Sequence, residues 1–324
     1  MDIETVYEMV SEDLQAVERE LIQNLHSEVS LIPTVGKYVL GSGGKRFRPL
    51  ILILSARSCG YVGKAYIDLA CILEFIHTAT LLHDDVVDDA KIRRGNHSAN
   101  TIWGNQASIL IGDFFFAQSF SLIAQTRNWR LLGVLTEATT KLATGEILDL
   151  VKERDSSCNE EDYLAIITHK TASLIEAASR IGAILGGVNE EKEMAMKNFG
   201  HNIGIAYQLM DDTLDYIATE EEFGKTIGKD LKEGKITLPL IHTLHNSTPK
   251  DREVITSTIE QEELTKEDLS QVLELIKRYQ GLEYSIEKAK QYSETAKNSL
   301  HGFAESPAKQ ALLTVADYVV TRRH

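Results

Sequence analysis

The chain has 324 residues, of which 43% are hydrophobic and 25% are charged, so it is long enough to bury a large core in one domain or two. Its formal net charge of −14 and its isoelectric point near 5.2 argue against a surface that binds nucleic acid. The mean hydropathy is −0.16, and no uninterrupted apolar run approaches the roughly 18 residues of a membrane span. We therefore expect a soluble protein without a transmembrane segment.

The first predicted element is an amphipathic helix near the N-terminus. Its apolar residues recur at spacings of three and four, with acidic residues between them: Val6, Met9, Val10, Leu14, Val17 and Leu21. The acidic start excludes a secretory signal or a transit peptide. The same spacing continues through most of the chain, which has only 5 prolines, and it predicts an all-α protein.

A glycine turn that carries three cations, Gly43 to Pro49 (GGKRFRP), precedes the first long apolar segment. No GxxxxGK[ST] pattern runs through it, so it is not a Walker A loop. Glycines let backbone N–H groups approach an anion closely, and the side chains of Lys45 and Arg48 can pair with phosphate oxygens. The turn is therefore a candidate phosphate-binding element.

The three cysteines indicate a reducing compartment. Cys59, Cys71 and Cys158 show no CxxC spacing and form an odd set, which fits neither a disulfide framework nor a zinc site. We expect idle or buried thiols in a cytoplasmic protein.

Two acid clusters of the same form lie far apart, at residues 84–88 (DDVVD) and 211–215 (DDTLD). On a helix, residues four apart share a face, so Asp84 and Asp88 point the same way, as do the first and last aspartates of the second cluster. Six like charges in an apolar bundle persist only with a compensating cation. Ligand sets made only of oxygen favour Mg²⁺, which proteins usually hold with one or two carboxylates plus substrate phosphates.

Each acid cluster is followed closely by basic residues. The cations after the first are Lys91, Arg93 and Arg94, and those after the second are Lys225, Lys229, Lys232 and Lys235. Any one of these charge runs is more often a solvated surface. Their joint placement beside metal carboxylates is what two separate diphosphates require, one bridged through Mg²⁺ and one held by Arg and Lys directly.

Fewer signals remain toward the C-terminus. We interpret His245 to Glu263 as a surface connection. Thr265 with Asp268 predicts a capping box, and Ser306 followed by Pro307 predicts the start of a last helix that runs to about Val320. No repeat or flexible linker marks a domain boundary, so a single domain is favoured.

At this point the chain resembles a known family, the trans-isoprenyl diphosphate synthases or polyprenyl synthetases. The matching segments are Gly43 to Pro49, Glu74 to Gly95 (EFIHTATLLHDDVVDDAKIRRG), Lys170-Thr171, Gly204 to Asp215 (GIAYQLMDDTLD) and Gly224 to Pro239 (GKTIGKDLKEGKITLP). The resemblance implies one polyprenyl synthetase domain over residues 1–324, folded as an all-α helical bundle around a deep central cavity. It also implies a homodimer.

The resemblance also implies roles for particular residues. Asp84 and Asp88 would bind two Mg²⁺ with Asp85 in support, Asp211 would bind a third, and Mn²⁺ would serve as a substitute; Asp212 belongs to the same catalytic set. The residues that would contact the allylic diphosphate are Arg93, Lys170, Lys225 and Lys235. Those that would hold isopentenyl diphosphate are Lys45, Arg48, His77 and Arg94. Thr171 and Gln208 would lie beside the reacting allylic carbon.

The implied activity is a Mg²⁺-dependent head-to-tail (1′-4) condensation of isopentenyl diphosphate with an allylic prenyl diphosphate. No protein nucleophile is needed, because neutralising the departing diphosphate lowers the cost of breaking the C–O bond. A metal phosphohydrolase of the HD type is a rival because of the dipeptide His83-Asp84, but it leaves the second acid cluster unexplained. A terpene cyclase and a non-catalytic synthase subunit are further alternatives. We expect His83 to be a hydrogen-bonded helix residue and not a metal ligand.

Product length is addressed by the residues before the first acid cluster. Ala79, Ile76 and Ile72 fall at spacings of three and four, so they share one stripe with Thr80 beside it. In short-chain synthases of this family, bulky aromatics near the positions of Ala79 and Thr80 form a tunnel floor, whereas here both residues are small. We therefore expect a long product, octaprenyl-like, for quinone side chains, with a short-chain farnesyl or geranylgeranyl synthase as the alternative. Candidates for a deeper floor are Phe114, Phe115 and Phe116.

Overall fold

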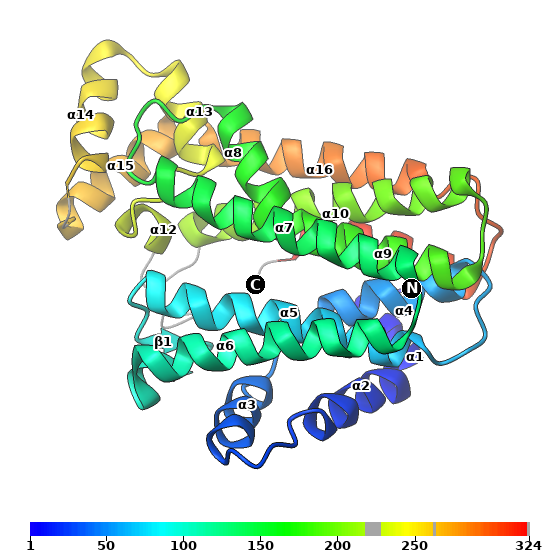
Figure 1. Ribbon diagram of the computed structural model, residues 1–324. Helices are drawn as coiled ribbons and strands as arrows, with labels where there is room; N and C mark the ends of the chain where they lie inside the picture. Colours follow the sequence, from blue (N-terminus) through cyan, green and yellow to red (C-terminus); the bar gives the residue numbers. More distant parts are fainter. Residues whose placement is uncertain (218–227, 262–263, 323–324) are drawn as a thin grey trace. The chain divides into compact units, whose positions relative to one another are not determined.

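The computed structural model describes residues 1–217, 228–261 and 264–322, and these residues are almost entirely helical (Figure 1). Within them the only strands are β1 (Ile92–Arg93) and β2 (Asn96–His97), which pair antiparallel with Ile92 opposite His97. The prediction of an all-α protein is confirmed.

The described residues form two compact units. The first takes its residues from 1–139, 177–197 and 302–314, and the second from 140–176, 198–301 and 315–322. Four helices have part of their length in each unit: α7 (Trp129–Lys152), α9 (Ser173–Gly186), α10 (Glu190–Ile217) and α17 (Pro307–Thr321). The prediction that the whole chain is one domain around a deep central cavity stays a prediction.

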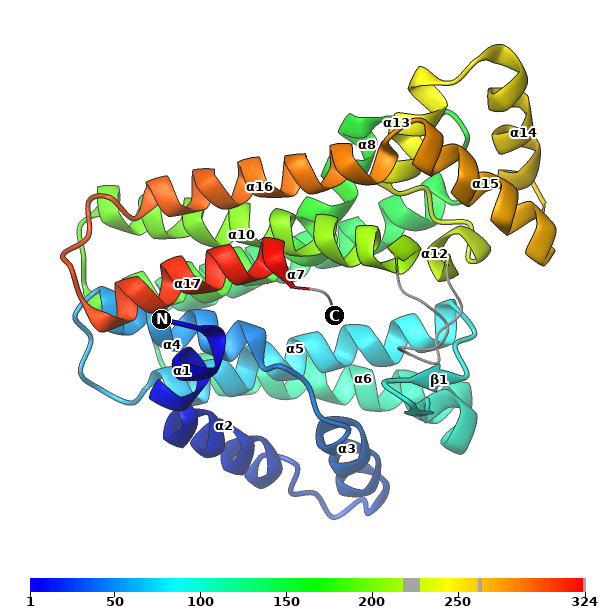
Figure 2. The same ribbon diagram turned by 180° about the vertical axis from the view of Figure 1, so that it is seen from behind.

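The first unit is built around buried helices. Its elements are α1 (Ile3–Met9), α2 (Ser11–Gln23), α3 (Leu31–Gly41), α4 (Phe47–Ser58), α5 (Tyr66–Val87), β1, β2 and α6 (Ala99–Gln125). Helices α5 and α6 run side by side in both views (Figures 1 and 2). Leu50 to Leu54 in α4 are fully buried, because that stretch is apolar all round and has no face for water.

The second unit packs shorter helices around its own core. Its elements are α8 (Glu160–Ile167), the π-helix η1 (Thr168–Ala172), α12 (Lys229–Lys232), α13 (Leu238–Asn246), α14 (Pro249–Ile259), α15 (Lys266–Arg278) and α16 (Gly281–Ser299). Leu209 of α10, Leu240 of α13 and Val272 of α15 are buried together in its hydrophobic core.

Two predicted elements need correction. The N-terminal apolar stripe is not one helix, because Val10 leaves helical geometry (φ −117°, ψ 8°) and separates α1 from α2. The described part of the stretch that begins at His245, residues 245–261, is not merely a surface connection, since α14 occupies much of it. Thr248 caps α14 by accepting the Asp251 N–H, Pro249 fills its first turn, and Ile255 is buried, which together explain why a polar sequence is helical there.

The predicted helix starts in the C-terminal region are confirmed. Thr265 and Asp268 form a reciprocal capping box at α15. The Ser306 hydroxyl accepts the Lys309 N–H at 3.1 Å as α17 begins at Pro307. Cys59, Cys71 and Cys158 are all free thiols, as expected.

Helix α6 bears on the membrane question. Its segment Asn105–Gln125, with a mean hydropathy of 1.5, is long and apolar enough to span a membrane by length and composition alone. The segment is not an uninterrupted apolar run, because Asp113 and several polar residues lie within it. The core helix of a soluble protein can have the same length and composition.

Candidate active site

The first acid cluster lies at the end of α5. The Asp88 N–H donates to the Asp84 carbonyl at 2.8 Å, so both aspartates belong to one helical turn, as expected, although Asp88 is the C-cap and not a residue of the helix body. Asp85 is buried and accepts the Arg93 Nε–H at 2.5 Å, and Asn100 donates to its backbone carbonyl at 2.9 Å. The cluster thus presents two half-buried carboxylates with a fixed third beneath them.

The β1–β2 hairpin returns basic residues to the glycine turn. Arg94 has a left-handed backbone (φ 52°), and its guanidinium donates to the Gly43 carbonyl. A Cβ at Gly44 would lie 2.9 Å from Arg94 Nη1, so a side chain at this position would displace the guanidinium. The structure therefore brings Arg94 to the predicted phosphate-binding turn.

His77 lies among cations. Burial, followed by the positive charges of Arg48, Arg94, Arg93 and Arg46, holds the pKa of His77 well below its usual value. A neutral imidazole beside several guanidiniums is a suitable place for an anion. Lys45 is exposed on the same glycine turn, with its backbone carbonyl accepting the Tyr7 hydroxyl at 2.7 Å.

Arg46 has a different role from its neighbours in the turn. Its guanidinium pairs with Glu18 and, at 2.7 Å, with the buried Glu74, and it donates to the Leu40 carbonyl at 2.8 Å. Of the three cations in GGKRFRP, Arg46 therefore joins neighbouring helices of the first unit.

The stripe below the first acid cluster is buried. Ile72, Ile76 and Ala79 are at most 1% exposed, and the Thr80 hydroxyl donates to the His77 carbonyl at 2.8 Å. Among the three predicted floor residues, Phe115 is fully buried and packs on Phe75 with ring centroids 5.2 Å apart, whereas Phe114 and Phe116 are only half-buried.

His83 lies against α6. Its Nε2 is 3.1 Å from the Ile109 carbonyl, which accepts a hydrogen bond from the ring N–H. His83 is therefore a hydrogen-bonded helix residue, as predicted.

In the second unit, the second acid cluster lies near the end of α10 and is held by distant residues. Asp211 pairs with the guanidinium of the buried Arg322 at 2.7 Å. The carboxylate of Asp215 accepts the backbone N–H of Asp230 at 3.1 Å, which ties the start of α12 to α10.

Asp212 lies between two donors. The Tyr163 hydroxyl and the Gln208 amide each donate to it at 2.6 Å, one to each carboxylate oxygen. Burial raises the pKa of Asp212 to about 7, with smaller contributions from Asp211 and Asp149, while the two hydrogen bonds act in the opposite direction.

Lys170 and Thr171 lie in the π-helix η1, a feature that often marks functional positions. Lys170 pairs with Glu146 at 2.6 Å and with Asp149 at 2.9 Å, and the Thr171 hydroxyl donates to the Gln208 amide oxygen at 2.8 Å. A Cβ at Gly145 would lie 2.6 Å from the backbone nitrogen of Lys170, so the absence of a side chain at Gly145 lets α7 approach η1 closely.

A cavity of about 120 Å³ joins these residues. The predicted site residues that line it are Lys170, Thr171, Gln208, Asp212 and Lys235, and the charged or hydroxylated residues that sequence reasoning missed are Asp149, Tyr163, Asp230 and Thr237. Burial first, then the negative charges of Asp212 and Asp215, raise the pKa of Asp230 well above its usual value. Lys225 lies outside the described residues. The cavity thus gathers predicted residues from three separate segments of the sequence.

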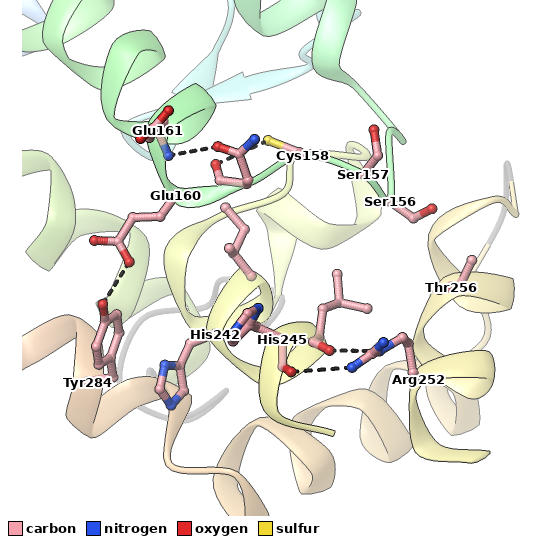
Figure 3. A pocket seen from close by; sticks show the side chains of 13 residues that line it. Ser156, Ser157, Cys158, Glu160, Glu161, His242, His245, Arg252, Thr256 and Tyr284 are labelled. Carbon is pink, nitrogen blue, oxygen red and sulfur yellow. Dashed lines mark hydrogen bonds between the residues drawn. The ribbon is translucent and has the colours of Figure 1, made fainter. Parts of the chain in front are cut away.

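A larger hollow in the second unit lies elsewhere. It measures about 680 Å³ and is lined by residues 156–161 and by residues of α13, α14 and α16. In Figure 3 the Glu160 carboxylate accepts the Tyr284 hydroxyl at 2.7 Å, and Arg252 reaches the carbonyls of Leu244 and His245. None of the predicted site residues lines this hollow.

The donor set fits Mg²⁺ that is shared with a substrate. Among the residues that the structure describes, no group of three or more His, Cys, Asp or Glu side chains is arranged to hold a metal ion by itself. Such a cation would take oxygens from one or two aspartates and complete its shell with diphosphate oxygens and water. The prediction that Asp84 and Asp211 serve one site stays a prediction.

Comparison with known proteins places the chain in a family. It matches the polyprenyl synthetase family model over residues 29–276. It is 40% identical to the octaprenyl diphosphate synthase of Escherichia coli (strain K12) over 322 residues, which are 99% of each chain. A polyprenyl synthase structure from Caulobacter crescentus, complexed with calcium and isoprenyl diphosphate, matches with a TM-score of 0.95 and 38% identity over 100% of this chain and 98% of that one. A decaprenyl diphosphate synthase structure from Rhodobacter capsulatus matches with a TM-score of 0.94 and 37% identity over 99% of each chain. The chain belongs to the polyprenyl synthetase family, and its fold is the all-α fold of those synthases.

Proposed function

We propose that the protein is a prenyltransferase that condenses isopentenyl diphosphate with an allylic prenyl diphosphate and makes a long-chain all-trans polyprenyl diphosphate. The observation that carries this proposal is the small cavity where Lys170, Thr171, Gln208, Asp212 and Lys235 meet. It combines cations for a diphosphate with uncharged oxygens for an electron-poor carbon. Family membership and the octaprenyl relative support the same activity.

The two diphosphates are assigned to different cations. Isopentenyl diphosphate is held by Lys45, Arg48, His77 and Arg94. Two observations support this assignment: Arg94 contacts the glycine turn, and several guanidiniums lie around His77. The allylic diphosphate is contacted by Arg93, Lys170, Lys225 and Lys235. The ion pairs of Lys170 with Glu146 and Asp149 hold its ammonium at the cavity until a diphosphate competes for it.

Asp84, Asp88 and Asp211 are the residues that would hold Mg²⁺, or Mn²⁺ as a substitute, with Asp85 fixing the first cluster. The bound cations would neutralise charge on the departing diphosphate. Three ions per site is part of this proposal. Removing divalent metal with EDTA should abolish turnover, and activity that persists in a metal-free assay would refute the scheme.

The chain's own groups then manage the carbocation. When the allylic C1–O bond breaks, diphosphate leaves with the bonding electrons, and the double bond of isopentenyl diphosphate attacks C1. A proton is then lost to the diphosphate. Thr171 and Gln208 lie beside C1 in this scheme, and the Thr171 hydroxyl donates to the Gln208 amide oxygen, which leaves the Thr171 oxygen with lone pairs for the electron-poor carbon. Apolar helices keep out water, which would otherwise capture the cation.

The product is proposed to be octaprenyl-like, from heptaprenyl to decaprenyl, and to serve as a quinone side chain. Ala79 and Thr80 are too small to close a tunnel, so the floor lies deeper, at residues such as Phe115. The alternative is a short-chain farnesyl or geranylgeranyl synthase.

Chromatography of dephosphorylated products tests both the activity and the chain length. The wild type should give products of C35 to C50, and Ala79→Phe or Ala79→Tyr should shorten them to about C15 to C20 by filling the channel. Ala70→Phe provides a matched control, because Ala70 is also buried in α5 but lies outside the proposed stripe. A wild-type product that stops at C15 or C20 would overturn the long-chain assignment.

We also propose a cytoplasmic homodimer. Helix α6 exposes several large apolar side chains: Ile102, Ile109, Leu110 and Phe120. Covering such a face in a second copy would remove apolar area from water. Sedimentation as a monomer at micromolar concentration would contradict this proposal.

A further inference from the structure

Four side chains of the second unit form one continuous hydrogen-bond chain. The Tyr163 hydroxyl donates to Asp212 Oδ2 at 2.6 Å, and Gln208 Nε2 donates to Asp212 Oδ1 at 2.6 Å. The Thr171 hydroxyl donates to Gln208 Oε1 at 2.8 Å. The chain therefore runs from α8 through α10 to the π-helix η1.

The chemistry of these groups fixes the direction of every bond. The amide nitrogen of Gln208 faces Asp212 and can only donate, so Asp212 Oδ1 is the acceptor, and the Gln208 carbonyl oxygen is turned toward Thr171. The Thr171 hydroxyl donates its only hydrogen to that carbonyl oxygen. The Thr171 oxygen is left with lone pairs, and Thr171 lines the cavity.

Tyr163 is placed to hold this arrangement. Its side chain is buried, and its hydroxyl occupies the Asp212 oxygen that Gln208 does not use. The helix that carries it is fixed at its start by a reciprocal capping box between Asn159 and Asp162, and Lys152 pairs with Asp162 at 2.9 Å. Without the Tyr163 hydroxyl, the carboxylate of Asp212 could rotate, and the Gln208 amide could rotate with it.

We propose that Tyr163 is a positioning residue, which acts through Asp212 and Gln208 to keep the oxygen lone pairs of Thr171 directed into the cavity. The inference rests on the proposed condensation, in which the allylic carbon beside Thr171 becomes electron-poor as its diphosphate leaves. It also gives Asp212 a role as the acceptor that orients Gln208. Tyr163 also lines the cavity, but in this scheme its hydroxyl is bonded to Asp212 and makes no contact with a substrate.

The experiment compares two tyrosine variants that each lose one hydroxyl. Tyr163→Phe should lower kcat about 10- to 100-fold, because misplaced groups at a reacting carbon cost this much. The KM values for both diphosphates should stay within about threefold, since no diphosphate contact is removed. Tyr279→Phe is the matched control. The Tyr279 hydroxyl donates to Asp251 at 2.6 Å, and its ring packs against the same hydrophobic core. Tyr279 does not line the small cavity and does not belong to the hydrogen-bond chain. Its kcat should match that of the wild type.

A double-variant cycle tests whether Tyr163 acts through the chain. Thr171→Val removes the end of the chain, so adding Tyr163→Phe to it should reduce kcat by less than about threefold further. Multiplicative losses in the double variant would mean that Tyr163 acts independently of Thr171, and they would overturn the proposal. Thr171→Ser keeps the hydroxyl and should restore the full effect of Tyr163→Phe.

Binding provides a readout that does not depend on turnover. A non-reactive thiolodiphosphate analogue of the allylic substrate should bind to Tyr163→Phe within about threefold of wild type by calorimetry. A kcat within threefold of wild type for Tyr163→Phe, or a loss of analogue binding equal to the loss of kcat, would overturn the inference. A wild-type protein that makes no condensation product would instead overturn the proposed function.

Asp212→Asn covers the case in which Tyr163→Phe does not fold. An amide at this position has one acceptor oxygen and one NH₂ donor, so it cannot accept from Tyr163 and Gln208 on two separate atoms as the carboxylate does. It should show the same loss of kcat with unchanged KM values. Unchanged kcat in a folded Asp212→Asn protein would count against the relay.

Discussion

The two acid clusters share one sequence form but have different supports. The first ends α5, and its buried Asp85 takes a guanidinium from only eight residues away, at Arg93. In the second cluster, Asp211 pairs with Arg322, which lies near the C-terminus, and Asp212 accepts a hydrogen bond from Tyr163 on another helix. The comparison teaches that one motif can be stabilised locally in one copy and by long-range contacts in the other.

The largest expected effect is on turnover, and there the two clusters should behave alike. Asp84→Ala and Asp211→Ala should each lower kcat by at least about 10²- to 10³-fold, because each removes a proposed ligand of the cation that neutralises the leaving group. Asp89→Ala is the control, since Asp89 is adjacent but exposed, and its carboxylate pairs with the exposed Lys91 at 2.6 Å. Isotope incorporation into extractable product is the assay. Normal turnover in either cluster variant would end the shared-site hypothesis.

Substitutions of the surrounding cations should raise the KM for a different substrate in each of the two regions. Lys45→Ala or Arg94→Ala should raise the KM for isopentenyl diphosphate about tenfold or more, whereas Lys235→Ala should raise the KM for the allylic substrate, because each loses a charge-assisted contact of about 1.5–3 kcal/mol. Initial rates with one substrate varied at a time would measure this. If Arg94→Ala raised the allylic KM alone, the assignment of the two diphosphates would be wrong.

Stability should distinguish the clusters where turnover does not. Asp211→Ala removes the carboxylate from Arg322, whose side chain is only 2% exposed, and should cost about 1–3 kcal/mol of unfolding free energy. Asp84→Ala should cost less than about 0.5 kcal/mol, because it relieves repulsion between acids at a half-buried helix end. Urea unfolding of the metal-free proteins would give both values. Equal costs would remove the distinction between local and long-range support.

A smaller effect should appear in the pH dependence of the first region. The pKa of His77 lies well below its usual value in the folded state, so on acidification the unfolded chain takes up the proton first. Its contribution is complete above the unfolded pKa of about 6.5 and declines as the pH falls toward the folded pKa. Between pH 7.5 and 5.5, the wild type should therefore lose about 1 kcal/mol more than His77→Gln. Parallel urea titrations at the two pH values would show this, and equal losses would contradict it.

The sequence was sufficient for the local features of the site. The spacing within each acid cluster, the glycine turn and the capping residues Thr265 and Ser306 act over a few residues, so pattern and chemistry predict them. The break at Val10 and the helix at residues 249–259 were missed because tertiary burial, as at Ile255, decides them.

Long-range partners were not predictable from one sequence. Tyr163 lies 49 residues from Asp212, and nothing in the residues around it differs from an ordinary apolar helix position. Glu146 and Asp149 resemble solvated acids until the fold brings Lys170 to them. Such contacts depend on which helices become neighbours, a property that periodicity does not encode.

The π-helix η1 limits how far the length of this segment can change. Tyr163 before it and Glu176 after it both contact α10, at Asp212 and at His201 (3.0 Å). A helix turns by about 100° per residue, so deleting one residue from η1 would swing one of these two contacts away from α10. Surface loops tolerate insertions and deletions. In this segment, by contrast, the contacts at both ends fix the helical register, so a change of one residue cannot be accommodated. We expect a one-residue deletion within Thr168–Ala172 to be far more damaging than one at Gln261, outside any helix.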